Sequence, residues 1–515
     1  MRNAKRAVLL AVFGALIAHA ATVNINLSAT HQTIEGFGGH NHITKWKVKE
    51  GPFYVDVPLD GQYDTMAYEL GLSMVRGWEI EGFNPSPGVY TVPGALAEKF
   101  GHTIGLLERG VDRHIISVLA PPAWMKSNND YAHGGILLPE HYDEFAEFIV
   151  HYIDTMQART GVKPYAFSLQ NELMFEEPYG SCEYTPQQYR DALKVVGPAL
   201  DAAGHSDVRI FGAEHMLWGI ANYEDAVFND GVAAPYLDII AVHNYTDGIQ
   251  PTPGSEAEQN WTNAGNYARS HGRPLWMTET SGYAQTWSGA LEVASFMYAA
   301  LQYGHMAGWC WLAISAVDGH ERLMNEYGLT PLGVASKHYF RFIRPGAQMV
   351  DCDDTDDNTV FATAYRHDGD NTVSVVILNT GSSAKTANLT GAGLPASFDV
   401  YQSTESQACA LVGTASTSVS LPARSITSLY NGEIPQYPYT SVKAKTSRAK
   451  AATAALGAGS VVEVFRVDGR RVARLSGGVD VHRAVSRLDL ARGGYYAVTR
   501  ARDGTVRTVP FVGLR

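Results

Sequence analysis

The chain has 515 residues, 45% of them hydrophobic, and a net charge of −12 at pH 7. This length exceeds a single ordinary core, so about two to three domains are expected, and the hydrophobic fraction indicates a globular protein throughout. Residues 440–515 carry fifteen Lys or Arg against five Asp or Glu, so a basic tail follows an acidic body. Because this tail is strand-like and carries no nucleic-acid motif, we expect no nucleic-acid partner.

Residues 1–20 have the pattern of a bacterial secretory signal, with a basic start, an apolar core and a small-x-small cleavage site. The apolar run is shorter than the roughly 20 residues that span a bilayer, and no later stretch is long enough. We therefore expect a mature protein that begins at Ala21 and is secreted or held at the cell surface. The three parts of the signal are Arg2, Lys5 and Arg6, then residues 7–17, then residues 18–20.

Residues 35–344 alternate short apolar runs with longer segments whose apolar residues recur every three to four positions. This is the rhythm of a parallel sheet covered by helices, and a region of this length fits a (β/α)8 TIM barrel of the α/β class. The candidate strands are residues 35–38, 73–76, 114–119, 165–170, 208–212, 239–243, 275–278 and 308–312.

The rhythm changes after residue 344 to period-two segments separated by Asp, Gly and Asn turns, which predicts an all-β side sandwich over residues 345–432. Residues 21–34 have the same alternation and are expected to join that sandwich. A polar stretch rich in Pro, Lys and Ala at residues 433–458 is typical of a linker. Residues 459–515 again read as strands and predict a small C-terminal β module.

Two carboxylates, Glu172 and Glu279, each end a short apolar β-like run, where a (β/α)8 barrel opens its active site. Two carboxylates across such a mouth are the minimal equipment of a glycoside hydrolase: one protonates the leaving oxygen and the other attacks or guides water. Asn171 directly precedes Glu172 and is placed to bond the substrate hydroxyl next to the reacting carbon. A solvated loop residue is the alternative for either Glu alone, but the pair favours catalysis.

Further candidates end other strands. Arg76 closes an early strand and would keep a nucleophilic carboxylate ionised, although an ordinary barrel salt bridge is the alternative. His243 and Tyr245 follow the sixth strand, where the tyrosine hydroxyl could orient Glu279. The histidine could contact the sugar or the proton donor, or be a packed core residue. Glu214 ends the fifth strand and is equally compatible with a supporting carboxylate or a structural one.

Tryptophans recur near the predicted rim, and their flat faces suit stacking on sugar rings in a polysaccharide groove. Some of them must lie in the core. Trp309 and Trp311 are two positions apart on the eighth strand, so they share one face, and only that face can meet substrate. The candidates for substrate binding are Trp78, Trp124, Trp287, Trp309 and Trp311, with Trp46 and Trp218 at the same rim.

No His or Cys cluster has metal-ligand spacing, so we expect no metal and no organic cofactor. The four cysteines allow three disulfide connectivities. Cys352 and Cys409 fall in the same predicted sandwich and could pair after export. Cys182 and Cys310 are equally compatible with free thiols.

Five motifs occur in order, and with them the chain resembles glycoside hydrolase family 30 over roughly residues 21–431. The resemblance implies a barrel with a tightly attached side sandwich built from both ends of the catalytic region, and a retaining double displacement. It assigns Glu172 as acid/base and Glu279 as nucleophile, which requires their carboxyl groups to lie about 5 to 5.5 Å apart. Glu172 would need a raised pKa and Glu279 a low one. The motifs are Gly-Phe-Gly-Gly (36–39), Ala-Pro-Pro-Ala-Trp-Met-Lys (120–126), Ser-Leu-Gln-Asn-Glu (168–172), Thr-Glu-Thr-Ser (278–281) and Phe-Ile-Arg-Pro-Gly (342–346).

The resemblance leaves several polysaccharides open, since the family includes glucuronoxylanases, other xylanases, β-1,6-glucanases, β-1,6-galactanases and glucosylceramidases. In the glucuronoxylan-specific members, a loop rich in Arg and Tyr after the eighth strand clamps the glucuronate. Residues 313–323 lack that Arg-Arg and Tyr-Gly-Pro pattern, so strict dependence on glucuronate is not expected. We favour a secreted retaining endo-xylanase that degrades plant cell walls. A β-1,6-glucanase or β-1,6-galactanase is the alternative, and a non-catalytic carbohydrate-binding protein is the second.

The C-terminal module resembles the sorting domains of type IX secretion in residues 464–472 and in the Gly-Tyr-Tyr of residues 494–496. The resemblance implies an interaction with secretion or cell-surface attachment machinery. The module is richer in Arg than that pattern, and carbohydrate binding is the competing interpretation.

Overall fold

The computed structural model describes residues 20–434, apart from residues 42, 44–46, 51–52, 57–58, 246–253, 317–320 and 354, together with the backbone of four strands between residues 461 and 513. The chain divides into two units, Met1–Tyr437 and Pro438–Arg515. The expected signal before Ala20, most of the expected linker and Trp46 lie outside the described residues.

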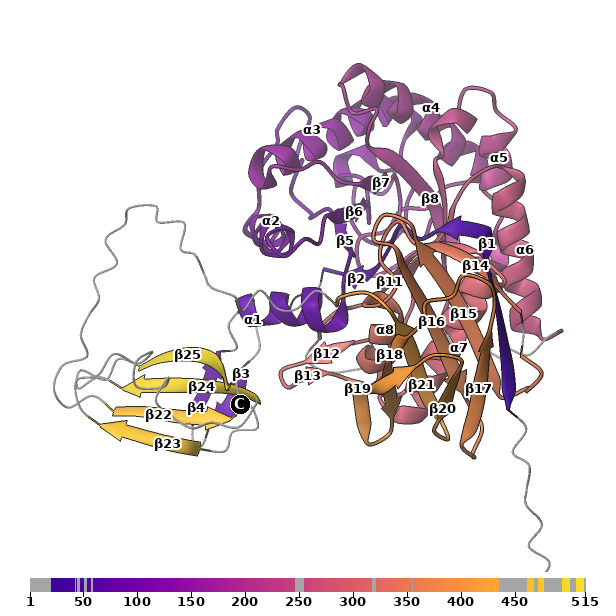
Figure 1. Ribbon diagram of the computed structural model, residues 1–515. Helices are drawn as coiled ribbons and strands as arrows, with labels where there is room; N and C mark the ends of the chain where they lie inside the picture. The colour runs from indigo at the N-terminus through magenta and orange to yellow at the C-terminus, as the bar shows by residue number, and fades with distance from the viewer. Residues whose placement is uncertain are drawn as a thin grey trace, which may run out of the picture. The chain divides into compact units, whose positions relative to one another are not determined.

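The first unit contains the predicted barrel, in which eight parallel strands close in the order β10-β11-β2-β5-β6-β7-β8-β9 (Figure 1). The fold class expected from the alternation of strands and helices is therefore confirmed. The barrel strands are β2 (Gly36–His40), β5 (Met74–Trp78), β6 (Arg113–Ser117), β7 (Ala166–Ser168), β8 (Arg209–Met216), β9 (Ile239–His243), β10 (Leu275–Glu279) and β11 (Met306–Trp311).

Helices surround the barrel, and several begin at a hydroxyl side chain that accepts a backbone N–H. Thr185 caps α4 in this way, with Gln188 completing a capping box. Ser255, Thr286 and Thr330 cap α6, α7 and α8. The helices are α1 (Leu59–Asp64), α2 (Gly94–Leu107), α3 (Tyr142–Thr160), α4 (Pro186–Ala202), α5 (Glu224–Phe228), α6 (Glu256–Ser270), α7 (Trp287–Gln302) and α8 (Pro331–Phe340), with a π-helical turn at Thr65–Leu70.

The barrel interior is closely packed. A Cβ atom on Gly38 would lie 1.7 Å from the backbone oxygen of Met74, so β2 approaches β5 too closely for any side chain there. The centre of the barrel is filled by an apolar cluster of Met74, Ile115, Ala166, Phe211, Ile239, Ala241, Trp276, Ala307 and Cys310. This plug leaves only the strand ends for chemistry.

A nine-stranded sheet forms the side sandwich, and its strands come from both ends of the unit. β1 (Ala21–Thr33) lies between β14 and β17, antiparallel to the first and parallel to the second. His338 of α8 is buried, with ring nitrogens 2.8 Å from Ser428 Oγ and 2.7 Å from Ser403 Oγ, so the sandwich is fixed to the barrel. The remaining strands are β14 (Gln348–Cys352), β15 (Val360–His367), β16 (Thr372–Asn379), β17 (Lys385–Thr390), β18 (Phe398–Thr404), β19 (Gln407–Ala415), β20 (Ser418–Leu421) and β21 (Ser425–Tyr430).

The disulfide considered between Cys352 and Cys409 is not formed. Cys352 packs inside the sandwich, whereas Cys409 is a buried free thiol in a different cluster with Phe342 and Tyr430. Sequence proximity placed both residues in one sheet but could not show that they belong to separate clusters. Cys182 and Cys310 are also buried free thiols.

The second unit contains a four-stranded antiparallel sheet in the order β23-β22-β24-β25. Its strands are β22 (Val461–Arg466), β23 (Arg471–Ser476), β24 (Gly493–Arg500) and β25 (Val506–Gly513). In the first unit, a short hairpin pairs β3 (Lys47–Glu50) with β4 (Phe53–Asp56). Among the described residues, no helix is long and apolar enough to cross a membrane.

Candidate active site

Glu279 is the last residue of β10, and it is 6% exposed. Arg76 donates from NH1 to its Oε2 over 2.6 Å, and the hydroxyl of Tyr245 donates to its Oε1. Burial raises the pKa of this carboxyl, but the charges of His243 and Arg76 outweigh burial and lower it overall. Glu279 is therefore an ionised, oriented carboxylate, and Tyr245 orients it as the sequence suggested.

Arg76 is fully buried in the middle of β5, which continues to Trp78 instead of ending at Arg76 as expected, and it holds several strands of the barrel mouth together. Besides Glu279, it donates to Asn171 Oδ1 over 2.6 Å and to Ser117 Oγ over 2.9 Å. Its NH2 group lies 3.0 Å from Oε1 of Glu214. Burial lowers the pKa of Arg76, but the charges of Glu214 and Glu279 raise it by more. The pKa therefore lies above its usual value, and the guanidinium stays charged.

Glu172 lies four residues after β7 ends, and it is 8% exposed. Nδ1 of His243, at the end of β9, lies 2.9 Å from its Oε1. Nε2 of the same ring lies 3.6 Å from Oε1 of Glu214. Burial lowers the pKa of His243, but Glu279, Glu172 and Glu214 raise it to about 9, so the ring is protonated at neutral pH and Nδ1–H donates to Glu172.

The backbone at two of these carboxylates is unusual. Glu172 has φ of 48° and Glu214 has φ of 55°, the left-handed region that non-glycine residues avoid. The N–H of Glu172 donates to the carbonyl of Glu214 over 3.0 Å, which fixes the two strand ends to each other. Such strain costs of order 1–3 kcal/mol per residue and persists where surrounding structure enforces it, typically at functional sites.

Glu214 is fully buried and lies against both cations of the mouth, Arg76 and His243. Burial raises its pKa, but Arg76 and then His243 lower it to about 2. The mouth therefore holds three glutamates around one guanidinium and one imidazolium. The sequence had left Glu214 open between a supporting and a structural carboxylate, and the structure places it against both cations.

The spacing of the two proposed catalytic carboxylates is short. One oxygen of Glu172, one oxygen of Glu279 and one ring nitrogen of His243 all lie within 4.8 Å of one another. Retaining glycosidases hold their carboxyl groups about 5–5.5 Å apart, whereas inverting ones need about 6.5–9.5 Å to admit water. The three atoms could also face a metal ion, but the positive charges of His243 and Arg76 make this donor set a poor fit for a cation.

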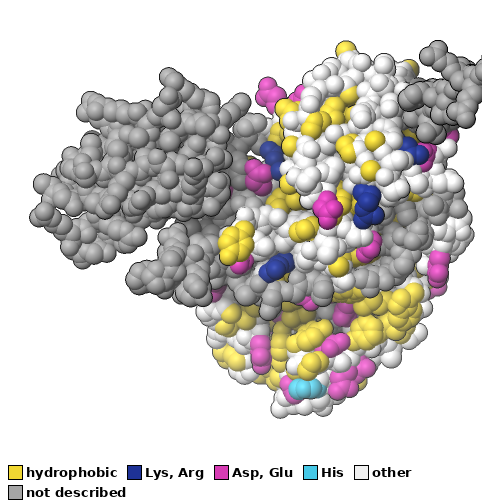
Figure 2. All heavy atoms as spheres, turned by 90° about the horizontal axis from the view of Figure 1, so that it is seen from below, with side chains coloured by type: hydrophobic (Ala, Val, Ile, Leu, Met, Phe, Trp, Pro, Cys, Tyr) yellow, Lys and Arg dark blue, Asp and Glu magenta, His cyan; other side chains and the backbone are white. Residues whose placement is uncertain are grey.

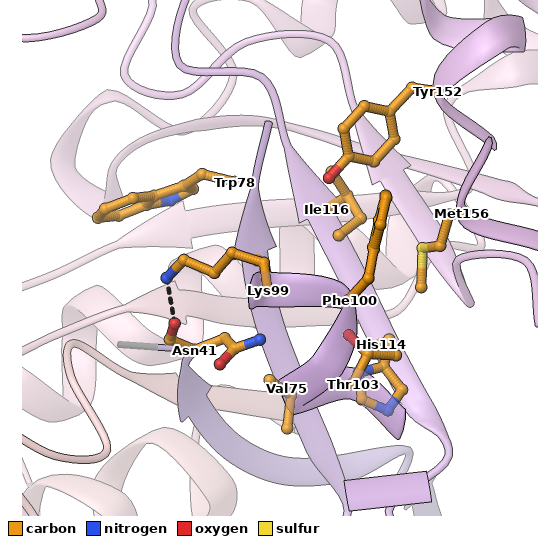
Figure 3. A pocket seen from close by; sticks show the side chains of 11 residues that line it. Asn41, Val75, Trp78, Lys99, Phe100, Thr103, His114, Ile116, Tyr152 and Met156 are labelled. Atoms are coloured by element: carbon orange, nitrogen blue, oxygen red, sulfur yellow. Dashed lines mark hydrogen bonds between the residues drawn. The ribbon is translucent and has the colours of Figure 1, made fainter. Parts of the chain in front are cut away.

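Among the tryptophans predicted at the rim, Trp78 and Trp124 are half-buried, and Trp218 is exposed. The ring of Trp78 stacks on His40 with centroids 3.5 Å apart. Behind it, the amine of Lys99 donates to the carbonyl of Asn41 in a cavity of about 10 Å³ (Figure 3). That volume holds a single water at most, so the cavity is not a substrate pocket.

Three predicted substrate contacts are wrong. Trp309 and Trp311 are fully buried in the layer between barrel and helices, against Phe296 and Tyr283. They do share one face of β11, but that face points away from the barrel interior that holds Cys310. Trp287 begins α7 and is 9% exposed, and its Nε1 donates to the carbonyl of Arg424 at the sandwich.

The sequence analysis missed Glu79 and Ser117. Glu79 accepts the N–H of Leu119 over 2.6 Å, the N–H of Ala120 over 3.2 Å and the hydroxyl of Tyr131 over 2.7 Å. Burial raises the pKa of Glu79 to about 7 despite these donors, and the residue borders a cavity of about 220 Å³. Ser117 is the last residue of β6 and Glu79 directly follows β5, so a polar side chain at the end of an apolar run was the signal that could have found them.

A closed parallel barrel with two close carboxylates at the carboxyl ends of its strands defines a glycoside hydrolase of the (β/α)8 class. Comparison with known families agrees. The glycosyl hydrolase family 30 TIM-barrel domain matches residues 107–340, and the beta sandwich domain of the same family matches residues 346–429. The chain belongs to glycoside hydrolase family 30.

Individual relatives are distant. The chain is 25% identical over 391 residues to glucuronoxylanase XynC of Bacillus subtilis, an alignment covering 72% of this chain and 81% of that protein. It is 27% identical over 292 residues to the lysosomal acid glucosylceramidase of Mus musculus, covering 51% and 55%. The solved structure of the family 30 subfamily 8 xylanase Xyn30A from Clostridium acetobutylicum superposes with a TM-score of 0.65 at 25% identity, covering 80% of this chain and all of that one.

Proposed function

We propose that this protein is a retaining endo-xylanase that cleaves the β-1,4-xylan backbone, with Glu279 as nucleophile and Glu172 as acid/base. The observation that carries the mechanism is the approach of the two carboxylates, whose oxygens lie within 4.8 Å. The Arg76 and Tyr245 contacts to Glu279 and the His243 contact to Glu172 give the two carboxylates different surroundings. Two carboxylates can act as nucleophile and as acid/base only when their surroundings differ.

In the first step, a carboxylate oxygen of Glu279 attacks the anomeric carbon, and the bond to the leaving oxygen breaks as that oxygen takes the proton of Glu172. The sugar is then held as an ester of Glu279. In the second step, Glu172 removes a proton from water, the water oxygen bonds to the anomeric carbon, and the ester bond breaks. Both carboxyl groups return to their starting protonation, and the configuration at the anomeric carbon is retained.

The residues around the carboxylates have separate tasks in this scheme. Arg76 and Tyr245 keep Glu279 ionised and aimed before attack. Asn171 is fixed by its bond to Arg76, and its amide group is placed to donate to the sugar hydroxyl beside the anomeric carbon. His243 donates to Glu172 and maintains its direction toward the leaving oxygen.

Xylan is supported by the relatives and by charge. Glucuronoxylanase XynC and Xyn30A are xylan-degrading by their names, and each aligns over most of its length with this chain. On the face shown in Figure 2, acidic side chains are more frequent than basic ones. An acidic surface suits a neutral polysaccharide better than a polyanion. The loop after β11 lacks the expected Arg-rich pattern, so we propose that glucuronate is not required.

Secretion and a sorting role for the second unit form part of the same proposal. The N-terminal pattern of residues 1–20 and the type IX-like motifs of residues 464–472 and 494–496 support them. Deleting residues 438–515 in the native host and assaying the culture medium and cell surface for xylanase separates the two interpretations of that unit. Loss of export supports sorting, whereas normal export with weaker retention on insoluble xylan supports carbohydrate binding.

The substrate is tested by the product profile on glucuronoxylan, unsubstituted xylan, arabinoxylan, β-1,6-glucan and β-1,6-galactan, with Glu279→Gln as control. We expect oligosaccharides from glucuronoxylan and unsubstituted xylan and none from the control. Activity confined to a 1,6-linked polymer would leave the fold and both carboxylates in place but refute the xylan assignment. Binding without turnover by the unaltered protein would indicate the non-catalytic alternative.

A further inference from the structure

Three aromatic side chains in the described part of the chain are strongly exposed. Tyr179 is 49% exposed, Trp218 is 71% exposed and Tyr327 is 79% exposed. Tyr179 lies between β7 and α4, and Trp218 lies two residues after β8. Tyr327 is in the turn of a hairpin of β12 (Met324–Asn325) and β13 (Gly328–Leu329) after β11. All three lie in loops that follow barrel strands, which is the catalytic face of this fold.

Two of these rings lie on the loops that follow β7 and β8, the neighbouring strands whose ends carry Glu172 and Glu214. β8 is the hydrogen-bonded neighbour of β7, and the N–H of Glu172 meets the carbonyl of Glu214, four residues before Trp218. Tyr179 lies on the same loop as Glu172. Its pKa is raised, first by burial and then by the charges of Glu172 and Glu177, as expected for a ring near that carboxylate.

The loops that carry the two rings make close contacts with the residues around them. The amine of Lys126 donates to the carbonyl of Ser181 over 2.7 Å and to that of Tyr131 over 3.0 Å, which ties the Tyr179 loop to the loop after β6. Next to Trp218, Gly219 packs so closely that a Cβ atom there would lie 2.8 Å from Nδ1 of His215. Preformed aromatic surfaces lose little conformational entropy on binding.

We propose that Trp218 and Tyr179 form a sugar-binding subsite on the leaving-group side of the cleaved bond. This inference rests on the proposed role of Glu172, because the residue that protonates the leaving oxygen must stand beside the departing sugar. The ligand class is a neutral pyranose unit of the polysaccharide, whose apolar face stacks on an aromatic ring. Glu177 lies on the same loop, two residues before Tyr179, and its negative charge disfavours a uronate there.

The subsite is tested by comparing two substrates that share the glycone but differ in the leaving group. Xylohexaose places sugars on the leaving-group side, whereas an aryl β-xylobioside releases only a phenol. For Trp218→Ala we expect kcat/KM on xylohexaose to fall about tenfold and kcat/KM on the aryl xylobioside to change less than about twofold. Trp218→Phe keeps a ring and should recover most of the loss, and Tyr179→Ala should repeat the pattern.

Two control variants show whether the loss of any exposed side chain lowers activity. Val232→Ala removes a side chain that is 54% exposed between α5 and β9, at the opposite end of the barrel, and should change neither substrate. Tyr327→Ala removes an equally exposed ring next to β11, which neighbours the Glu279 strand, so any loss should fall equally on both substrates. A loss that Trp218→Ala shows equally on both substrates, or on neither, overturns the subsite. If the unaltered protein cleaves neither substrate, the proposed function itself fails.

Discussion

The same strands form both ends of the barrel, but the charged side chains at the two ends differ in how deeply they are buried. At the amino end, Arg209 of β8 pairs with the partly exposed Glu35 and covers the rings of Tyr165 and Trp276. At the carboxyl end, three buried glutamates face Arg76 and His243 with little contact with water. Burying charges costs more than their attraction returns unless every partner is in place. We conclude that the charged residues at the amino end serve stability and those at the carboxyl end serve catalysis.

The largest effect is expected from replacing the nucleophile, which should abolish activity and leave the fold intact. Glu279→Gln keeps the side-chain volume but cannot form the sugar ester, so we expect kcat on xylan to fall at least about 10⁴-fold. Thermal unfolding should remain cooperative, because Arg76 keeps Glu214 and Asn171 as partners. Activity within tenfold of the unaltered protein would assign the nucleophile elsewhere.

The proton donor is identified by the dependence on the leaving group. Glu172→Ala should lose about 10²–10⁴-fold on xylan, where the leaving oxygen needs a proton, and much less in the first step on an aryl glycoside with an acidic phenol. Added azide should accelerate turnover of the aryl glycoside by replacing water, with a β-glycosyl azide as product. An α-azide, or no rescue on any substrate, would contradict the assignment.

His243 links the stability of the carboxyl end to pH. Its pKa is raised from 6.5 to about 9 in the folded protein, chiefly by Glu279, Glu172 and Glu214 acting against burial. The protonated ring therefore stabilises the fold fully below pH 6.5, and this contribution is lost as the pH rises toward 9. Denaturation of the unaltered protein and of His243→Gln from pH 6 to 9.5 should show their difference shrinking by up to about 3 kcal/mol. A difference that does not depend on pH would show that the ring is neutral in the fold.

The smallest effect is expected from a substitution at the amino end of the barrel, which should change stability but not activity. Arg209→Met removes the ion pair with Glu35 and the contacts with two aromatic rings. We expect a loss of about 1–2 kcal/mol in unfolding free energy with kcat on xylan unchanged. A fall in kcat at temperatures where the variant is fully folded would show that the two ends are not independent.

The sequence predicted much of the fold because hydrophobic periodicity reports directly on strands and helices. It also placed Glu172, Glu279 and His243 at or just after strand ends, and parallel strands bring such ends together, whereas Arg76 lies in the middle of its strand. It failed at Trp309 and Trp311, because a spacing of two shows that they share a face but not whether that face points to the helices. The strand ends alone also did not show that Glu79 would fasten the loops after β5 and β6.

The loop aromatics illustrate a second limit. Tyr179 and Tyr327 lie in loops without periodicity, so no pattern distinguished them from packed rings. The loop of Tyr179 is held by contacts such as the one that Lys126 makes with the carbonyl of Ser181, a residue 55 positions along the chain. Such contacts follow from the folded structure and not from local sequence.

The most direct test of the central claim is to trap the sugar ester. The protein is incubated with a 2-deoxy-2-fluoro xylobioside that carries an activated leaving group, and the adduct is located by peptide mass mapping. We expect one fluoroxylobiosyl group per chain, on Glu279, with loss of activity in step with labelling and no labelling of Glu279→Gln. An adduct on another residue, or hydrolysis to the α-anomer without any adduct, would contradict a retaining mechanism with Glu279 as nucleophile.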